Sequence, residues 1–175
     1  MPETLKTIDI STVRKLDIGA GANRRDTDYA TVDFYHEAAD IKAEMWDMPM
    51  IAENSIEEIW AEHCLEHIPI VKVAPTLKEW FRVLKPGGRA IVSVPNFDYV
   101  AKYWLTGPDR LWAEMMVFGN QAHDGEFHKC AFSPALLRGD CEAAGFKVKY
   151  VNILWTHNQE TLRATCIKEP AGSKP

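Results

Sequence analysis

Two glycines that follow an acidic residue and a short apolar run form the first stretch of this chain that could hold a ligand closely. The run occupies residues 15–18 and contains Asp17, and the turn after it is Gly19, Ala20 and Gly21. Glycine has no Cβ, so a buried strand that ends in glycines lets the backbone approach a ligand. Such a turn near the start of a chain indicates a nucleotide-type ligand.

Two carboxylates stand at the ends of two further β-like runs. Residues 29–34 are rich in aromatic and β-branched side chains and hold Asp33 near their end, while residues 55–62 end in Glu62. In dinucleotide-binding folds, a carboxylate at the end of the second strand accepts hydrogen bonds from ribose hydroxyls. Asp33 is therefore a candidate ribose ligand.

Three histidines are candidate general bases, because imidazole titrates near neutral pH. His63 directly follows the run at 55–62, and His123 and His128 lie in the polar stretch 119–130. For each of them, a structural or merely polar role is the competing interpretation.

A zinc site is an alternative reading of the same region. His63 and His67 are four residues apart and would share one face of a helix, where His128 or Cys130 could join them. The motif is not HExxH, however, because Cys64 stands where that motif carries its general-base glutamate. We therefore expect no metal ligands in this chain.

The elements that must position these groups begin with closely spaced strands. A strand at 14–18 is followed by one at 29–34 after only about ten residues, whereas a parallel crossover with a helix needs a dozen or more. The intervening residues are polar and end in turn formers, so the first crossover is expected to be a loop or a single turn. A short third strand is expected at 39–44 and a fourth at 55–62.

The clearest helix follows Pro69. Its apolar residues fall on one face at helical spacing, and Pro75 is tolerable only in its first turn. The sequence Lys-Pro-Gly-Gly at 85–88 ends this helix, and the apolar run at 90–94 is typical of a strand covered on both faces in a parallel sheet. The expected apolar face consists of Val73, Leu77, Trp80, Phe81 and Leu84.

The second half of the chain predicts two helices at 98–105 and 109–118, which would form a lid or side wall. A further helix opens at Ser133 with proline at its first position. Two strands at 146–154 and 161–167, separated by polar residues, predict a closing hairpin.

Composition indicates a soluble protein of one domain. The chain has 175 residues and a formal net charge of −5, without a run of Lys or Arg that would mark a general nucleic-acid binder. Its start lacks the pattern of a secretory signal, and no apolar run approaches the ~20 residues that span a bilayer. We therefore expect a cytoplasmic protein; its oligomeric state is open.

The glycine turn, the acidic strand ends and the helix-turn-strand unit together resemble the class I S-adenosylmethionine-dependent methyltransferases, from about residue 15 to residue 168. Residues 62–68 (EHCLEHI) joined to residues 80–88 (WFRVLKPGG) look like the small methyltransferases called type 11. Three shorter stretches resemble members of that group linked to cell-surface sugar pathways, namely residues 118–121, 128–129 and 144–146.

This resemblance implies a three-layer, Rossmann-like α/β fold. Its sheet would be mostly parallel with an antiparallel last strand, and the first crossover helix would be reduced or absent. Residues 1–175 would form one methyltransferase domain. The cofactor core would lie at about 14–97 and 133–168, with a substrate-side insertion at about 98–132.

The resemblance also assigns roles to the residues of the cofactor site. Asp17 would help to hold the ammonium group of S-adenosylmethionine, and Asp33 would bind the ribose. The glycine turn would contact the amino-acid end of the cofactor. The turn residues are Gly19, Ala20 and Gly21. The remaining expected cofactor residues are Phe34 on the adenine, Glu44 and Met45 at the adenine edge, and Glu62 at the methionine part.

The implied reaction is transfer of a methyl group to a small-molecule or saccharide-type acceptor, leaving S-adenosylhomocysteine. One alternative is a methyltransferase-like domain that binds the cofactor or a partner without turnover. A less favoured one is an NAD-dependent oxidoreductase, since the glycine turn begins its fingerprint. Arg24 stands in place of the third glycine of that fingerprint, and the helix that would hold a pyrophosphate is missing.

Overall fold

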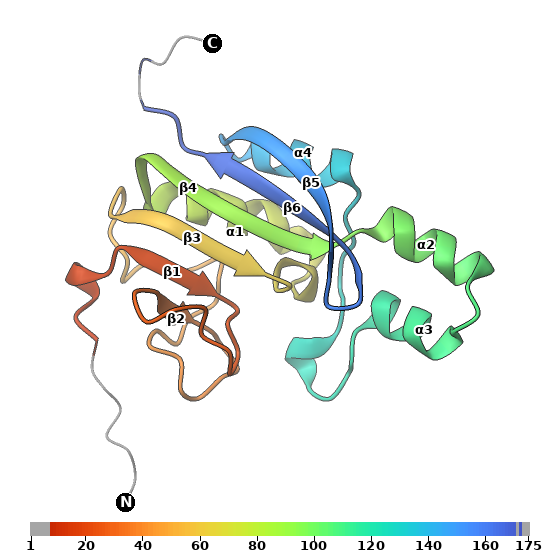
Figure 1. Cartoon of the computed structure of the whole chain (residues 1–175). Helices are drawn as coiled ribbons and strands as arrows, with labels where there is room; N and C mark the ends of the chain where they lie inside the picture. The colour runs from red at the N-terminus through yellow and green to blue at the C-terminus, as the bar shows by residue number, and fades with distance from the viewer. Residues whose placement is uncertain (1–7, 171, 173–175) are drawn as a thin grey trace, which may run out of the picture.

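The computed structural model describes residues 8–170 and residue 172. A six-stranded sheet in the order β2-β1-β3-β4-β6-β5 forms the centre of the molecule (Figure 1). The strands are β1 Lys15–Ile18, β2 Ala30–Val32, β3 Ile56–Glu62, β4 Leu84–Pro95, β5 Lys147–Thr156 and β6 Gln159–Ile167.

The first four strands are parallel and the last two form the predicted hairpin. β1 pairs in parallel with β2 and β3, and β3 pairs in parallel with β4. β6 runs antiparallel to β4, and β5 antiparallel to β6. Because parallel strands end at the same edge, the turns after β1, β2 and β3 meet there, which is where α/β sheets bind ligands. The predicted α/β fold class is confirmed.

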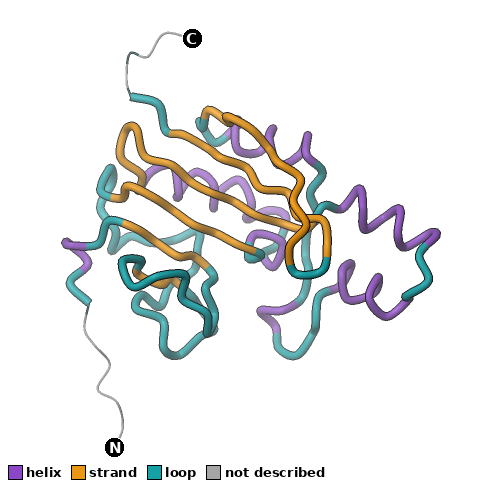
Figure 2. Tube along the Cα trace, in the orientation of Figure 1, coloured by secondary structure: helices purple, strands orange, loops and turns teal. Residues whose placement is uncertain are grey.

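Helices cover one face of this sheet. Figure 1 shows α1 (Ile70–Val83) and α4 (Pro134–Ala143) behind it, and the tube in Figure 2 shows the same arrangement. Trp80 and Leu77 of α1 and Leu137 of α4 are fully buried, so these helices close the core. α2 (Phe97–Thr106) and α3 (Arg110–Phe118) pack on each other beyond the carboxyl edge of the sheet, close to the predicted bounds.

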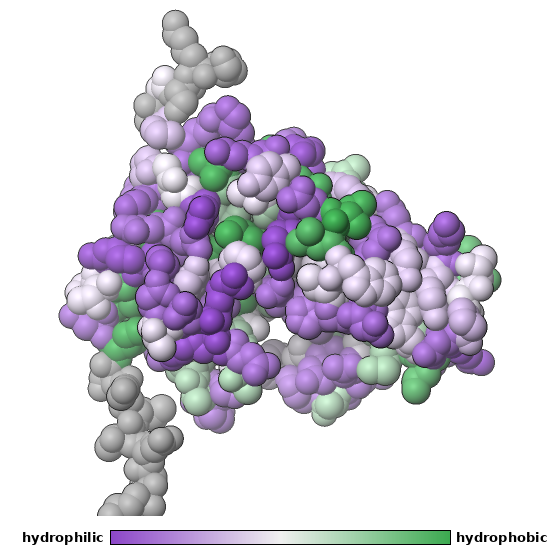
Figure 3. All heavy atoms as spheres, viewed as in Figure 1, coloured by the Kyte–Doolittle hydropathy of each residue, from purple (hydrophilic) through white to green (hydrophobic). Residues whose placement is uncertain are grey.

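The opposite face of the sheet carries loops where a second helical layer would lie. Residues 19–29, between β1 and β2, form turns and no helix, as the short spacing predicts. Figure 1 shows no helix in front of the sheet. Most side chains on this face are hydrophilic in Figure 3. Among the described residues, no helix is long and apolar enough to cross a membrane.

The prediction of a third strand at 39–44 is wrong. Two isolated bridges form there, a parallel one between Val32 and Ile41 and an antiparallel one between Glu44 and Asp47. The Asp40 side chain instead accepts hydrogen bonds from the backbone and hydroxyl of Thr31, at 2.9 and 3.1 Å. A side chain that takes the place of a backbone partner ends the ladder, and this stretch also has few β-branched residues to favour a strand.

The predicted helix follows Pro69 as expected but differs in the position of Pro75 and at its carboxyl end. It begins at Ile70, so Pro75 is its sixth residue and lies in the second turn rather than the first. Proline has no N–H group, so the Val71 carbonyl four residues earlier loses its helical donor. Val71 is 75% exposed, and water can take the place of that donor. Leu84, expected on the helix, is the first residue of β4.

Candidate functional site

Two adjoining cavities lie along the carboxyl edge of the parallel strands. The larger, about 790 Å³, extends over the bare face of the sheet toward α3, and the smaller, about 390 Å³, lies beside the end of β2. Figure 3 shows the surface hollowed in this region. The two cavities share four lining residues: Gly19, His63, His67 and Asn120.

The glycine turn has the backbone that its sequence predicts. Gly19 and Gly21 have φ of +69° and +54°, a left-handed region that glycine enters without penalty. A Cβ on Gly19 would lie 2.3 Å from the Cβ of Cys64, whereas one on Gly21 would meet nothing within 4 Å. The close approach at Gly19 is therefore to the turn that follows β3, and Gly21 is free on its outer side.

Asp33 lies at the end of β2 and lines the small cavity. One carboxylate oxygen accepts hydrogen bonds from the N–H groups of Tyr35 and His36, and the other accepts from Gly21 at 3.0 Å. A carboxylate offers about four acceptor sites, so roughly one remains open. Asp33 thus fixes the glycine turn, a role that sequence reasoning missed, and keeps limited capacity for a ligand hydroxyl.

The other expected adenine-side residues also line the small cavity. Phe34 is 46% exposed there, and its ring packs edge-on against Tyr35. Burial raises the pKa of the Glu44 carboxyl. The Met45 carbonyl accepts a hydrogen bond from Trp80 Nε1 at 3.1 Å, so the core helix α1 holds this segment in place.

Asp17 lies on the bare face of the sheet and lines the large cavity. Its carboxylate is buried and accepts a hydrogen bond from the Arg25 backbone at 2.8 Å. Burial raises the pKa of the Asp17 carboxyl, against this hydrogen bond and the charge of Arg25, which lower it. A buried carboxylate in this state is stabilised by a cation, because ionisation without one costs desolvation energy.

The loop that replaces the first crossover helix is tied to the sheet by charged side chains. The Arg25 guanidinium lies 3.2 Å from the ring centroid of Trp60, and Lys15 pairs with Asp28. Stacking of a guanidinium on an indole ring, together with the Asp17 hydrogen bond, gives the loop a fixed course without helical hydrogen bonds.

Glu62 lines the large cavity but not the small one. Its carboxylate accepts from Arg163 of β6 at 2.6 Å and from Trp60 Nε1 at 3.3 Å. This ion pair spans β3 and β6, on either side of β4. The expected cofactor role of Glu62 therefore stays a prediction, because both of its oxygens already have partners in the protein.

His63 is held at both ring nitrogens. Nδ1 lies 3.2 Å from Glu66 Oε1, and Nε2 lies 3.3 Å from Thr161 Oγ1, whose oxygen accepts from Thr156. This partner set assigns the proton to Nδ1, since a carboxylate only accepts. His63 also has φ of +52°, an uncommon value for a residue with a side chain. It has no free lone pair in this arrangement.

The two remaining candidate bases lie apart. His123 is exposed on the rim of the small cavity, and its Nδ1 accepts from the Gly125 backbone at 3.1 Å. His128 lines the large cavity, and its Nδ1 lies 2.8 Å from the Met116 carbonyl, so the free nitrogen is Nε2. Of the three predicted histidines, the geometry favours His128 as a base.

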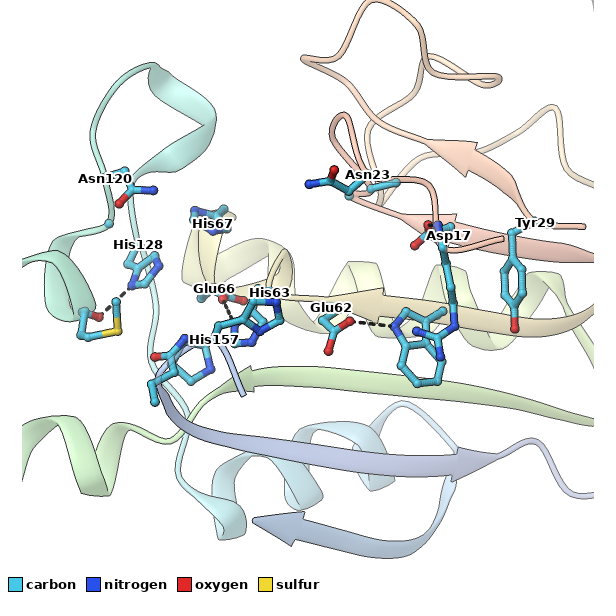
Figure 4. A pocket seen from close by; sticks show the side chains of 18 of the residues that line it. Asp17, Asn23, Tyr29, Glu62, His63, Glu66, His67, Asn120, His128 and His157 are labelled. Atoms are coloured by element: carbon cyan, nitrogen blue, oxygen red, sulfur yellow. Dashed lines mark hydrogen bonds and ion pairs between the residues drawn. The ribbon is translucent and has the colours of Figure 1, made fainter. Parts of the chain in front are cut away.

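Several residues that line the cavities were not among the predicted site residues, namely Glu66, His67, Asn120 and His157. Figure 4 shows Glu66, His67 and His128 close together beside the end of β3, with His157 near His63. Glu66 and His67 belong to the same EHCLEH stretch as Glu62 and His63, so this motif could have indicated them as site residues. His157 and Asn120 come from turns whose position depends on the hairpin and on the loop after α3.

The comparisons with known proteins agree with this geometry. Residues 7–92 match the family model described as a methyltransferase domain, of type 11. No curated protein matches the chain. The matched region covers the glycine turn, the end of β2 and the EHCLEH stretch.

Solved structures extend the similarity in fold to most of the chain. A SAM-dependent methyltransferase from Methanosarcina mazei has 17% identity and a TM-score of 0.67 over 89% of this chain and 92% of that one. A Burkholderia thailandensis 1,6-didemethyltoxoflavin-N1-methyltransferase with bound S-adenosylhomocysteine has 16% identity and a TM-score of 0.60. The match covers 89% of this chain and 71% of that one.

A third similar structure is the complex of the Haloferax volcanii Trm112 methyltransferase activator with a methyltransferase, at 14% identity and a TM-score of 0.65 over 97% and 88%. At identities of 14–17%, the comparison with solved structures shows similarity of fold alone. The family match covers residues 7–92, which include the residues expected around the cofactor. Residues 7–92 thus match the type 11 methyltransferase domain family, and the structure has the class I methyltransferase fold, with S-adenosylmethionine as the cofactor that the match and these structures support.

Proposed function

We propose that this protein transfers a methyl group from S-adenosylmethionine to a small-molecule or saccharide-type acceptor. The observation that carries the proposal is the junction of the two cavities at Gly19, His63 and His67. Methyl transfer is an in-line displacement, so cofactor and acceptor must meet end to end in one aligned path. Two cavities that share a narrow set of residues supply such a path.

The residues that line the cavities on either side of the junction fit the cofactor. Asp17 is a buried carboxylate that a cation would stabilise, which suits the ammonium group of S-adenosylmethionine. Asp33 and Phe34 face the small cavity, which suits the ribose and adenine. Gly19, Ala20, Gly21, Glu44 and Met45 would complete this site, with Glu62 facing the acceptor side.

The acceptor side is supplied by the insertion proposed at residues 98–132. Met115, Met116, Asn120 and His128 from this segment line the large cavity. The mixture of amide, imidazole and thioether groups suits a polar acceptor with an apolar edge, such as a saccharide derivative. Similar structures include a toxoflavin-precursor methyltransferase and an rRNA methyltransferase, so fold similarity leaves the acceptor open.

The chemistry needs little beyond alignment and removal of a proton. S-adenosylmethionine supplies a methyl group on a sulfonium sulfur, which keeps the electron pair when the carbon–sulfur bond breaks. The acceptor oxygen or nitrogen forms the new bond with its lone pair and loses a proton. His128, with its free Nε2 on the large cavity, is the residue we assign to receive that proton.

The affinity for S-adenosylmethionine should fall as the pH drops through the raised pKa of Asp17. Only the ionised carboxylate attracts the ammonium group, and the pKa of Asp17 lies above its usual 3.8, so the loss begins at a higher pH than for an ordinary aspartate. Titration calorimetry from pH 8 to pH 5 measures the change. Asp17→Asn should lose roughly ten- to a hundredfold in affinity at pH 8 and show a flatter pH profile.

Replacement of Asp33 tests the ribose assignment. Asp33→Ala removes both the open acceptor site and the hydrogen bond that fixes Gly21, so S-adenosylmethionine should bind at least about tenfold more weakly by calorimetry. Glu37→Ala is the matched control, because Glu37 lies on the same segment, is exposed and pairs only with Lys42. Equal affinity in the two variants would remove Asp33 from the site.

The decisive experiment combines binding with turnover. Calorimetry measures S-adenosylmethionine binding to the full chain, and mass spectrometry of a reaction with saccharide acceptors detects a methyl gain and S-adenosylhomocysteine. Absence of cofactor binding would contradict the proposal. Binding without transfer to any acceptor would favour a catalytically silent domain, an alternative that the fully occupied nitrogens of His63 support.

A further inference from the structure

We propose that Glu66, His67 and His128 form a binding site for one divalent transition-metal ion of the zinc type. Each residue offers one ligand atom, and these three atoms lie within 4.8 Å of one another. Two imidazoles and a carboxylate are a ligand set of catalytic zinc sites, which keep further positions for water or substrate. Figure 4 shows the three side chains gathered at the cavity wall.

The buried carboxylate supplies an independent observation. Glu66 is only 2% exposed, and its Oε2 has no hydrogen-bond partner. Its Oε1 is taken by His63 Nδ1 at 3.2 Å. An unpartnered buried carboxylate oxygen is costly, because it loses its water without gaining a protein partner. A cation bound to Oε2 removes this cost.

Both histidines present the nitrogen that a metal requires. His67 Nδ1 lies 3.2 Å from the Phe127 carbonyl, and His128 Nδ1 lies 2.8 Å from the Met116 carbonyl. A carbonyl oxygen only accepts, so each ring carries its proton on Nδ1 and leaves the Nε2 lone pair free. A backbone carbonyl behind the imidazole is the usual outer partner of a metal-binding histidine.

Backbone hydrogen bonds join the two segments that carry the ligands. The Lys129 and Cys130 N–H groups both donate to the Glu66 carbonyl, at 2.8 and 3.3 Å, and the Cys130 thiol contacts the Leu65 carbonyl at 3.3 Å. Metal bonds of about 2.0–2.2 Å place ligand atoms roughly 3.5 Å apart, so side-chain closure of about 1 Å completes the site.

The position of the site suggests its ligand. Glu66, His67 and His128 all line the large cavity. If the proposed methyl transfer is correct, on which this step rests, the open position of the ion would hold an oxygen of the acceptor, such as a sugar hydroxyl. A bound divalent ion lowers the pKa of a coordinated hydroxyl and fixes its orientation. With the ion bound, His128 Nε2 is a ligand and no longer a base, so the proton of the coordinated hydroxyl leaves to water.

Metal titration of the chelator-treated full chain tests the site without any methyl acceptor. Calorimetry with Zn²⁺ alone should give one ion per chain, and Co²⁺ should give the visible absorption of a site with nitrogen ligands. His67→Ala and His128→Ala should each weaken Zn²⁺ binding by roughly a hundredfold or more. His157→Ala is the matched control, because His157 lines the same cavity but lies outside the ligand set.

Two results would overturn the metal site: no binding of Zn²⁺ by the wild type, or equal affinity in the wild type and the His67→Ala/His128→Ala double variant. Circular dichroism checks the fold of each variant, and His128→Gln replaces any variant that fails to fold. S-adenosylmethionine binding to the metal-free chain is measured separately. Cofactor binding without Zn²⁺ binding removes only the metal site, and Zn²⁺ binding without cofactor binding removes only the proposed function.

Discussion

Gly19→Ala should destabilise the protein and abolish tight binding of S-adenosylmethionine. The new Cβ would lie 2.3 Å from the Cβ of Cys64, and the residue would keep a φ of +69° that alanine disfavours. The left-handed backbone costs about 1–2 kcal/mol, and overpacking of a filled site costs about 1–3 kcal/mol. Together they remove a large part of the free energy of unfolding of a typical domain.

Gly21→Ala separates the two contributions. Gly21 has a similar φ of +54°, but a Cβ there meets nothing within 4 Å. Chemical unfolding should therefore show a loss of about 1–2 kcal/mol for Gly21→Ala and about 2–5 kcal/mol for Gly19→Ala. Cys64→Gly combined with Gly19→Ala should recover part of the difference. Equal losses in the two single variants would contradict a close approach between the glycine turn and the turn after β3.

Local sequence signals predicted the framework of the site well. The strand and turn around Asp17 and Gly19 follow from an apolar run that ends in glycines. The absence of a first crossover helix follows from the short spacing and from the polar, turn-forming residues between the strands. These features depend on neighbours in the sequence. The stretch at 39–44 was predicted wrongly because its outcome depends on one side chain, Asp40, which takes a backbone partner from β2.

Contacts between residues that are distant in the sequence could not be predicted from the sequence. His67 and His128 come from segments distant in the sequence, which meet where the Lys129 and Cys130 N–H groups donate to the Glu66 carbonyl. Glu62 pairs with Arg163 only through the register of β6, a strand placed by the closing hairpin. The residue types indicated that these side chains are reactive. Their interaction partners could be identified only from the three-dimensional structure.

Trp80→Ala should cost about 3–5 kcal/mol in the free energy of unfolding, the range for removal of a fully buried tryptophan. Trp80 is fully buried in the last turn of α1 and donates from Nε1 to the Met45 carbonyl at 3.1 Å. The same side chain therefore closes the core and holds the segment expected at the adenine edge. Urea unfolding of the variant measures the first effect.

Trp80→Phe isolates the second effect, because a phenyl ring keeps much of the packing but has no N–H group to donate. The Met45 carbonyl then loses its only described side-chain donor, which costs about 1–3 kcal/mol. Calorimetry should show weaker binding of S-adenosylmethionine in this variant. Trp104→Phe, a change at a 44% exposed position on α2, should leave both stability and cofactor affinity close to wild type. If Trp80→Phe binds the cofactor as tightly as Trp104→Phe does, the adenine-side segment is positioned by its own turn and not by the core helix.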